Sequence, residues 1–346
     1  MGEFHMRYVL IAFCLLLSAG PIWPQTAPVA EPRRPATRGK RLAFPSSGVQ
    51  KPVKSSLYDD RRPRMAGSST GYIDNAVIGT QVRFRFDGDF DLRNPDRAEF
   101  FYAKCGCYRP TPDPNAAGPG SQPATSANLQ EVQLNVEYAP SARFSILAET
   151  PARWIQFRPS VIGTASGIGD FRAGFKAGLI ATDKRSITLQ FRTYFPTGNS
   201  RLGLGTNHYS IEPTVLYHER LTKRLAISGQ FGGWHPIGGS KGLGSDPSDR
   251  FAGDILEYGF GAAYDVLVRD SYRVTPVVEF VGWSVLSGFV TGPPNVSGSG
   301  VNIVNAKLGT RVSFGKHHSV YAGYGRELTH SSWYTNMLRL EYRFAL

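Results

Sequence analysis

The feature that most constrains the fold is a two-residue alternation of apolar and polar side chains, which recurs from about residue 72 to the C-terminus. In the final stretch NMLRLEYRFAL (336–346), every second position from Leu338 to Phe344 is apolar. Successive side chains of a strand point to opposite faces, so each such stretch predicts a two-faced strand. In a soluble sheet the apolar face would meet a core, whereas in an outer-membrane barrel it meets lipid and the polar face lines the lumen.

The connections between the alternating segments distinguish these two folds. Short connections such as 182–184 and 222–223 alternate with longer ones such as 91–128 and 238–252, as in outer-membrane barrels with short periplasmic turns and longer extracellular loops. We therefore predict an all-β transmembrane antiparallel β-barrel of about 12 strands, with both termini at the short-turn side. The expected strands are 72–90, 129–139, 142–157, 169–181, 185–196, 208–221, 224–237, 253–268, 271–286, 300–314, 318–328 and 333–346.

The polar faces of these segments carry many charged residues, which a dry core could not hold without a large cost in free energy. The same alternation turns them toward the lumen. They can act as a solute-selecting lining or as a ladder of salt bridges that holds a narrow barrel together, and the two roles are compatible. The lumen-lining candidates are Arg83, Arg85, Arg172, Lys176, Arg192, Glu212, Glu257, Glu279, Lys307, Arg311, Arg339 and Glu341.

The N-terminal part of the chain differs from the rest in composition. Arg7 precedes the apolar run 8–17 and small residues follow it, so 1–25 is predicted to be a secretory signal peptide. Residues 31–65 carry ten Lys/Arg against three acids, which supplies +7 of the formal net charge of +12. We expect 26–70 to be a disordered, basic periplasmic segment and 71–346 to form the barrel. An exported chain rarely meets nucleic acid, so no nucleic-acid partner is expected.

The connection 91–128 is too long for a simple hairpin turn. Cys105 and Cys107 lie within it, and in an oxidising compartment they would form a strained local disulfide or stay as two free thiols. The stretch RAEFFYAKC (97–105) is also strand-like, and we interpret it as a short piece of this loop or as an extension of the first hairpin above the membrane. Its apolar residues are expected to pack over or into the barrel mouth.

An enzyme is the main rival class. Serine lies beside His330 in THSS (329–332), but adjacency in sequence is not a triad. No histidine lies near the cysteine pair to complete a metal site. We predict no enzymatic activity, no catalytic residues, no metal and no cofactor.

Three stretches, GIGDFRAGFKAGLI (167–180), the long run from Phe191 to Gly239 and YGFGAAYDVL (258–267), resemble the outer-membrane protein family named for the MetA pathway of phenol degradation. The likeness covers roughly 160–346, while the basic N-terminal part and the Cys-Gly-Cys loop depart from the family pattern. It implies a transporter-like channel for small, hydrophobic or aromatic solutes in the bacterial outer membrane. The expected partners are membrane lipid, lipopolysaccharide, the barrel assembly machinery and an unidentified solute. The alternative is a non-conducting surface or structural protein, such as an adhesin or receptor.

Overall fold

The structure, a computed structural model, describes residues 68–92, 126–158, 164–199, 202–206, 208–237, 252–290, 296–330 and 333–346. All of them belong to one compact unit, Ser55–Leu346. The predicted signal peptide, the basic segment up to residue 67 and the Cys105–Cys107 pair lie outside the described residues. Among the described residues, no helix is long and apolar enough to cross a membrane.

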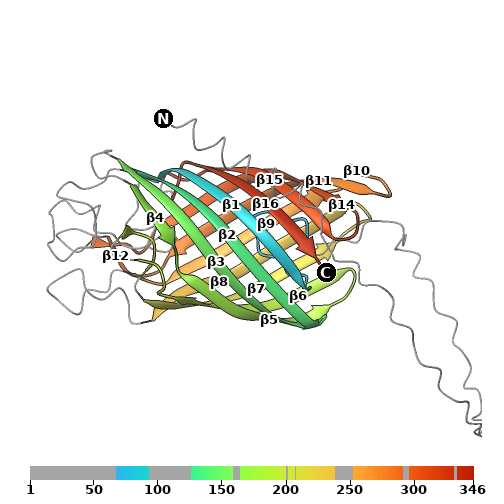
Figure 1. Cartoon of the computed structure of the whole chain (residues 1–346), viewed down its shortest axis with the longest axis horizontal. Helices are drawn as coiled ribbons and strands as arrows, with labels where there is room; N and C mark the ends of the chain where they lie inside the picture. The colour runs from blue at the N-terminus through green and yellow to red at the C-terminus, as the bar shows by residue number, and fades with distance from the viewer. Residues whose placement is uncertain are drawn as a thin grey trace, which may run out of the picture. The chain divides into compact units, whose positions relative to one another are not determined.

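Twelve long antiparallel strands form the wall of a closed barrel (Figure 1). Each strand pairs with the next long strand, and pairing of the first with the last, from Gln81 opposite Ala345 to Phe90 opposite Asn336, closes the ring. The predicted fold class is thus confirmed. The wall strands are β1 Gln81–Leu92, β2 Ser126–Ser141, β3 Phe144–Arg158, β5 Phe171–Ala181, β6 Arg185–Phe195, β7 Tyr209–Arg220, β8 Leu225–Ile237, β9 Ile255–Tyr264, β11 Tyr272–Val285, β14 Asn302–Phe314, β15 His318–Glu327 and β16 Asn336–Ala345.

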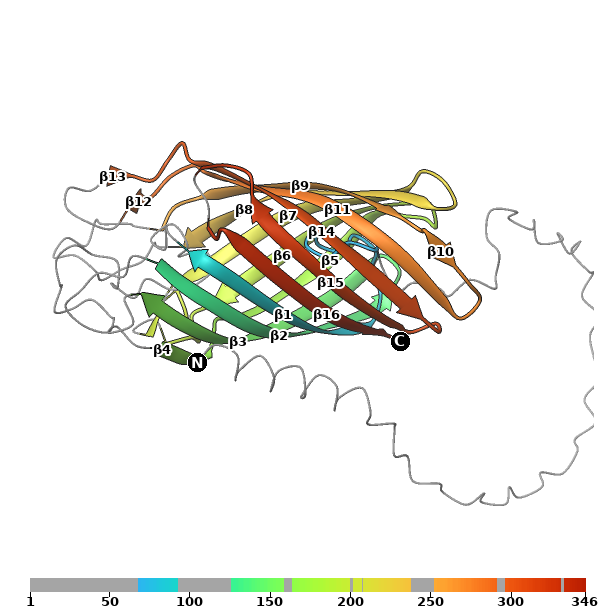
Figure 2. The ribbon, with the colours of Figure 1, turned by 90° about the horizontal axis from the view of Figure 1, so that it is seen from above.

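Four short strands decorate this wall. Strand β4 (Thr164–Ile168) pairs with the end of β3, and β10 (Leu267–Val268) pairs with the start of β11. Strands β12 (Phe289–Val290) and β13 (Val296–Ser297) form a separate hairpin in a long connection (Figure 2). The short turns gather at one end of the barrel and the long connections at the other. We call these the short-turn end and the long-loop end.

The two faces of the wall follow the alternation of the sequence. Leu189 on β6 is 37% exposed on the outer face, and Phe231 on β8 is 59% exposed. The neighbour of Leu189, Gln190, points inward and is 0% exposed. An apolar outer band of this kind would be costly in water and is favourable in lipid.

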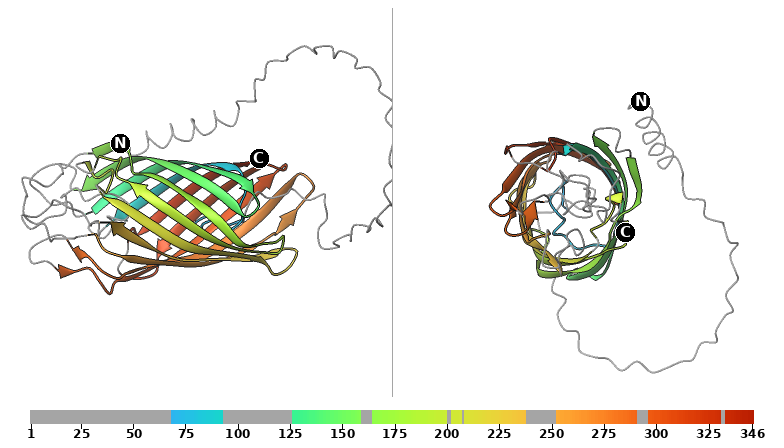
Figure 3. Two further views of the ribbon diagram at one scale, coloured as in Figure 1. Left: turned by 90° about the horizontal axis from the view of Figure 1, so that it is seen from below. Right: turned by 90° about the vertical axis from the view of Figure 1, so that its left-hand side faces the viewer.

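The first strand departs from the expectation. It begins at Gln81 rather than at residue 72, and residues 68–80, which we call the lumen loop, lie inside the barrel (Figure 3, right). The loop both enters and leaves at the short-turn end, because Arg343, near the end of β16, donates to the Ser68 carbonyl (3.1 Å) and the Leu346 amide donates to the Thr80 carbonyl (3.0 Å). Residues 68–70 are therefore part of the barrel interior rather than of a free periplasmic segment.

Candidate functional site

The lumen loop is held by its main chain. The carboxylate of Glu279 on β11 accepts hydrogen bonds from three consecutive amides, those of Gly71 (3.2 Å), Tyr72 (3.0 Å) and Ile73 (3.0 Å). Glu279 is fully buried, so these amides take the place of the water that would solvate it in an open lumen. Gly71 is required here, because a Cβ at this position would lie 2.0 Å from the Tyr321 ring.

Cationic side chains hold the carbonyls of the same loop. Arg311 on β14 donates to the carbonyls of Ser69 (3.2 Å) and Thr70 (2.7 Å), and Arg339 on β16 donates to that of Gly71 (2.9 Å). On the opposite wall, Lys176 on β5 donates to the Asn75 carbonyl (3.0 Å) and Thr188 on β6 to the Ala76 carbonyl (2.6 Å). The loop therefore binds strands on both sides of the lumen.

The far end of the loop adds a buried ion pair. Arg192 on β6 lies 2.7 Å from the carboxylate of Asp74 and 2.6 Å from that of Glu212 on β7. Gln190 donates to the Asp74 carboxylate (2.9 Å), and the Asp74 amide donates to Gln230 on β8 (3.0 Å). Arg192 is thus paired with one carboxylate from the loop, Asp74, in addition to the carboxylates of the wall.

Above the loop, the inward charges pair with one another across neighbouring strands. Arg339 forms a two-point contact with Asp87 (2.6 and 2.8 Å), and Arg153 lies 2.7 Å from Glu131. Arg85 bridges the two carboxylates at 3.0 Å from Asp87 and 3.5 Å from Glu131. Ion pairs of this kind fix the wall rather than leave free charge to face a solute.

A cavity of about 140 Å³ remains between the lumen loop and the long-loop end. Charged side chains form most of its lining, and Leu129, Val281 and Met337 add apolar surface. Four aromatic side chains also reach it: Tyr72 from the loop, Tyr194, Trp283 and Tyr334. The cavity can therefore hold a small molecule that has both a charged and an apolar part.

An apolar cap of buried side chains lies above this cavity at the long-loop end. The cap consists of buried side chains at the strand ends together with Leu204, Trp333 and Tyr334 from the connections. The Leu204 carbonyl accepts from Arg153 (3.1 Å), and Asp170 accepts from the amides of Gly198 (2.9 Å) and Thr206 (2.7 Å), which folds that connection inward. The strand members of the cap are Leu92, Ala127, Leu129, Ile155, Phe157, Ala165, Tyr194, Trp234, Ile255, Val281, Trp283, Val285, Ile303 and Met337.

Tyr334 joins the cap to the charged cavity. Its hydroxyl accepts a hydrogen bond from the Lys307 ammonium (2.6 Å). Burial, with the nearby carboxylate of Asp89 acting in the same direction, raises the pKa of Tyr334 well above its ordinary value. The hydroxyl therefore keeps its proton at neutral pH.

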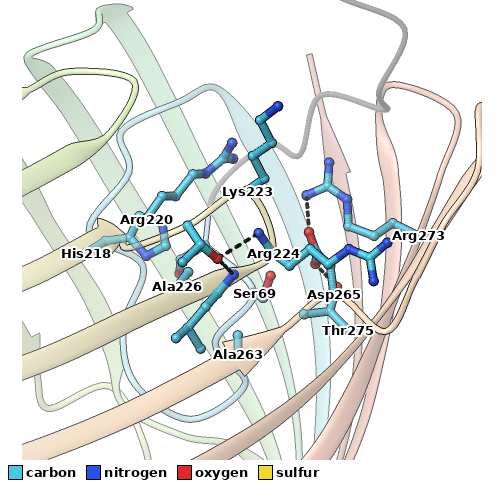
Figure 4. Close-up of a pocket in the computed structure, with 13 residues that line it drawn as sticks. Ser69, His218, Arg220, Lys223, Arg224, Ala226, Ala263, Asp265, Arg273 and Thr275 are labelled. Carbon is cyan, nitrogen blue, oxygen red and sulfur yellow. Dashed lines mark hydrogen bonds and ion pairs between the residues drawn. The ribbon is translucent and has the colours of Figure 1, made fainter. Parts of the chain in front are cut away.

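A second, smaller cavity of about 30 Å³ lies at the base of the loop (Figure 4). Ser69 of the loop faces it, and so do the cation-bearing side chains of the turn between β7 and β8. Asp265 is the carboxylate in the lining, and it is bound by Thr275 (2.7 Å) and Arg273 (3.6 Å). The short-turn mouth is thus predominantly basic where the loop enters.

All twelve lumen-lining candidates have inward side chains. Arg311, Arg339, Glu279 and Lys176 bind the lumen loop directly, as described above. Arg83 lies 3.8 Å from Glu149 and 4.0 Å from Glu341, whereas Arg172 lies 3.6 Å from Glu149. Arg85, Arg192, Glu212, Glu257 and Lys307 reach the larger cavity, and Glu341 binds Arg311 (2.8 Å). The expectation that they face water needs correction at the loop, because polypeptide occupies that space.

Several residues of the site were not among the candidates. Asp87, Asp89, Glu131 and Arg153 lie on β1, β2 and β3 at positions that the two-residue period also turns inward, so the sequence could have placed them. Tyr72 and Asp74 carry no such signal, since they belong to no strand. The expected segment 72–90 is longer than a spanning strand needs, because about 9–11 residues suffice to cross a bilayer as a tilted strand. This excess length indicates that part of the segment lies outside the wall.

The described residues contain no group of three or more His, Cys, Asp or Glu side chains that could hold a metal ion. His330 lies beside two residues that the structure does not describe. The strand-like stretch 97–105 and the connection 93–125 likewise lie outside the described part of the chain.

Comparison with known proteins finds structures with a similar fold. No protein-family model matches the chain, and no curated protein matches it. An outer-membrane channel from Pseudomonas putida F1 has a similar structure, with TM-score 0.51 and 14% identity over 81% of this chain and 100% of that one. The β domain of the Bordetella autotransporter BrkA gives TM-score 0.45 and 12% identity over 78% and 100%, and the KdgM porin 0.38 and 9% over 77% and 99%.

The first of these likenesses, together with the closed wall and its apolar outer band, defines the class of the protein. It is a twelve-stranded β-barrel of the outer-membrane type. In this class the short turns face the periplasm and the longer loops face the exterior. The resemblance to the MetA-pathway family stays a prediction, since no family model matches.

Proposed function

We propose that this barrel is a channel for small hydrophobic or aromatic solutes, closed by the lumen loop on the periplasmic side and by the apolar cap on the outer side. One observation carries the proposal. Both ends of the loop leave through the same mouth, at Ser68 and Thr80, so the loop can withdraw without breaking a strand pair of the wall. A structural brace would be expected to cross from one end of the barrel to the other.

The lining supports this choice of solute. The apolar cap and the aromatic side chains of the cavity favour a molecule with an apolar body. The paired charges below would admit it only when the loop moves, because their hydrogen bonds are already taken by the loop and by one another. Lipid and lipopolysaccharide surround the barrel under this proposal, and the barrel assembly machinery inserts it. It involves no enzymatic chemistry.

The test is single-channel recording in planar bilayers. The variants are a deletion of 69–79, which joins Ser68 to Thr80, a cap variant Trp333→Ala, and the two combined. Because the two closures lie in series, we expect the combined variant to conduct most and the wild type least. Glu219→Gln is the matched control, since Glu219 pairs with Arg185 (2.9 Å) and none of its hydrogen bonds or ion pairs in the described structure involves the loop.

Correct folding of each variant is checked by its heat-dependent mobility on gels. If the combined variant is folded and electrically silent, the channel proposal is wrong. The barrel would then be a non-conducting surface or structural protein, the alternative that a filled lumen also fits. Liposome uptake of an aromatic solute against a sugar of similar size separates the expected solute class from a general pore.

A further inference from the structure

An ammonium group already lies inside an aromatic cage at the centre of the barrel. The Lys307 nitrogen is 3.9 Å from the ring centre of Tyr72, 5.3 Å from that of Tyr334 and 5.6 Å from that of Trp283. The Met337 sulfur lies 3.5 Å from the same nitrogen. Aromatic faces attract cations, and such cages are a known means of binding organic ammonium groups. The centre of the lumen is therefore built to hold this kind of charge.

The cavity beside this cage has more carboxylates than cations. Seven acids and six bases reach it, so one negative charge is left when all are ionised. Two of the acids, Asp89 and Glu257, form no ion pair within the described part of the chain, and neither does one base, Lys307, which leaves a surplus of one negative charge. The acids are Asp74, Asp87, Asp89, Glu131, Glu149, Glu212 and Glu257, and the bases are Arg85, Arg153, Arg172, Arg192, Lys307 and Arg339.

Of the two carboxylates, Asp89 gives the stronger evidence for a ligand site. It is 6% exposed, lines the cavity, and its buried Oδ1 atom has no hydrogen-bond partner in the described structure. A buried carboxylate without a partner is costly, and a cationic ligand lying against it would offset part of that cost. Glu257, 7% exposed, reaches the same cavity from β9.

Five of the six bases already lie against carboxylates. Arg339 and Arg85 are engaged with Asp87, Arg153 with Glu131, and Arg172 and Arg192 with carboxylates of their own walls. Lys307 is held by the cage. An anionic ligand would add to the negative surplus and would have to displace a carboxylate from its base. A cation of charge +1 brings the lining to neutrality without breaking any of these pairs.

We propose that this cavity binds a small organic ammonium ion, with its charge toward Asp89 and Glu257 and its apolar part toward the cap. This proposal specifies the solute of the proposed channel. It rests on the channel function only for the route by which the ligand enters the cavity. It adds one requirement to the solute class, a cationic amine on an apolar body. Lys307 keeps its place against Tyr72 and Trp283, so the ligand ammonium lies beside the cage and depends on Asp89 and Glu257.

The probe is choline, and its matched control is 3,3-dimethyl-1-butanol, which has nearly the same shape without the charge. The full-length protein is refolded from urea in detergent with either compound, so that a closed lumen cannot prevent entry. A ligand that binds the folded barrel and not the unfolded chain raises the free energy of unfolding, and with it the urea midpoint, by RT ln(1 + [L]/Kd). We expect choline to raise the midpoint with the logarithm of its concentration once that concentration exceeds Kd, and to bind at least about tenfold more tightly than the neutral compound.

Asp89→Asn and Glu257→Gln should each weaken choline binding by about tenfold or more, whereas Glu219→Gln at the short-turn rim should leave it unchanged. Equal midpoint shifts with choline and the neutral compound would overturn the proposal, and so would full binding by the double carboxamide variant. The assay needs no conduction. If the barrel binds choline but is silent in bilayers, the ammonium site is supported and the channel proposal is wrong. If the barrel conducts but does not bind choline, the channel is supported and the ammonium site is wrong.

Discussion

Replacement of Glu279 by Gln tests whether one side chain holds the lumen loop in place. The substitution keeps the shape of the side chain and removes its charge. The carboxylate accepts three loop amides, at 3.0 to 3.2 Å. A glutamine offers a single carbonyl oxygen, and its NH2 group faces loop amides that are themselves donors. We therefore expect the barrel wall to stay intact and the docked state of the loop to lose stability.

The size of the effect follows from these bonds. A hydrogen bond to a charged group contributes about 1.5–3 kcal/mol, and two of the three are lost if glutamine retains one. Part of this loss is offset, because a buried carboxylate carries a desolvation cost that glutamine avoids. A net loss of about 2–3 kcal/mol corresponds to a roughly 30- to 150-fold larger population of the undocked loop.

Hydrogen exchange followed by mass spectrometry measures this population directly, because amide protection reports the free energy of local opening. Peptides that cover 68–80 should exchange about 30- to 150-fold faster in Glu279→Gln, while peptides from the wall strands should not change. Gly71→Ala should have a similar effect by a steric route, since its Cβ would meet the Tyr321 ring. Unchanged protection of the loop in both variants would refute the anchoring role of Glu279, and Glu219→Gln is the control for loss of a carboxylate elsewhere.

Three further outcomes are expected. Leu189→Arg, on the lipid face, should lower the free energy of unfolding by about 2–4 kcal/mol in urea titrations, and Gln190→Ala should cost clearly less; equal losses would contradict the assigned faces. Protease added to intact cells should cut a site inserted in 238–251 and spare one in 182–184, and the opposite pattern would invert the orientation. Deletion of 97–125, which ends before β2, should raise solute uptake without preventing assembly, whereas failure to assemble would place 97–105 in the wall.

The wall of the barrel could be predicted from local patterns. The last strand was expected at 333–346 and lies at Asn336–Ala345, and the eighth was expected at 253–268 and begins at Ile255. A strand repeats its direction every two residues, so the sequence alone tells which side chains face lipid and which face inward. The alternation of short and long connections further predicts an even number of strands, and it shows which end of the barrel carries the short turns and which carries the long loops.

The contents of the lumen could not be predicted in this way. Residues 72–80 read as the beginning of a strand, because nothing local in them reveals partners such as Glu279, 206 to 208 positions further along the chain. The same holds for the apolar cap, where Leu204 and Trp333 belong to one cluster only because distant connections fold to the same mouth. The two-residue period gives the direction of a side chain, whereas what fills the space it points into depends on contacts that form only when the sheet closes.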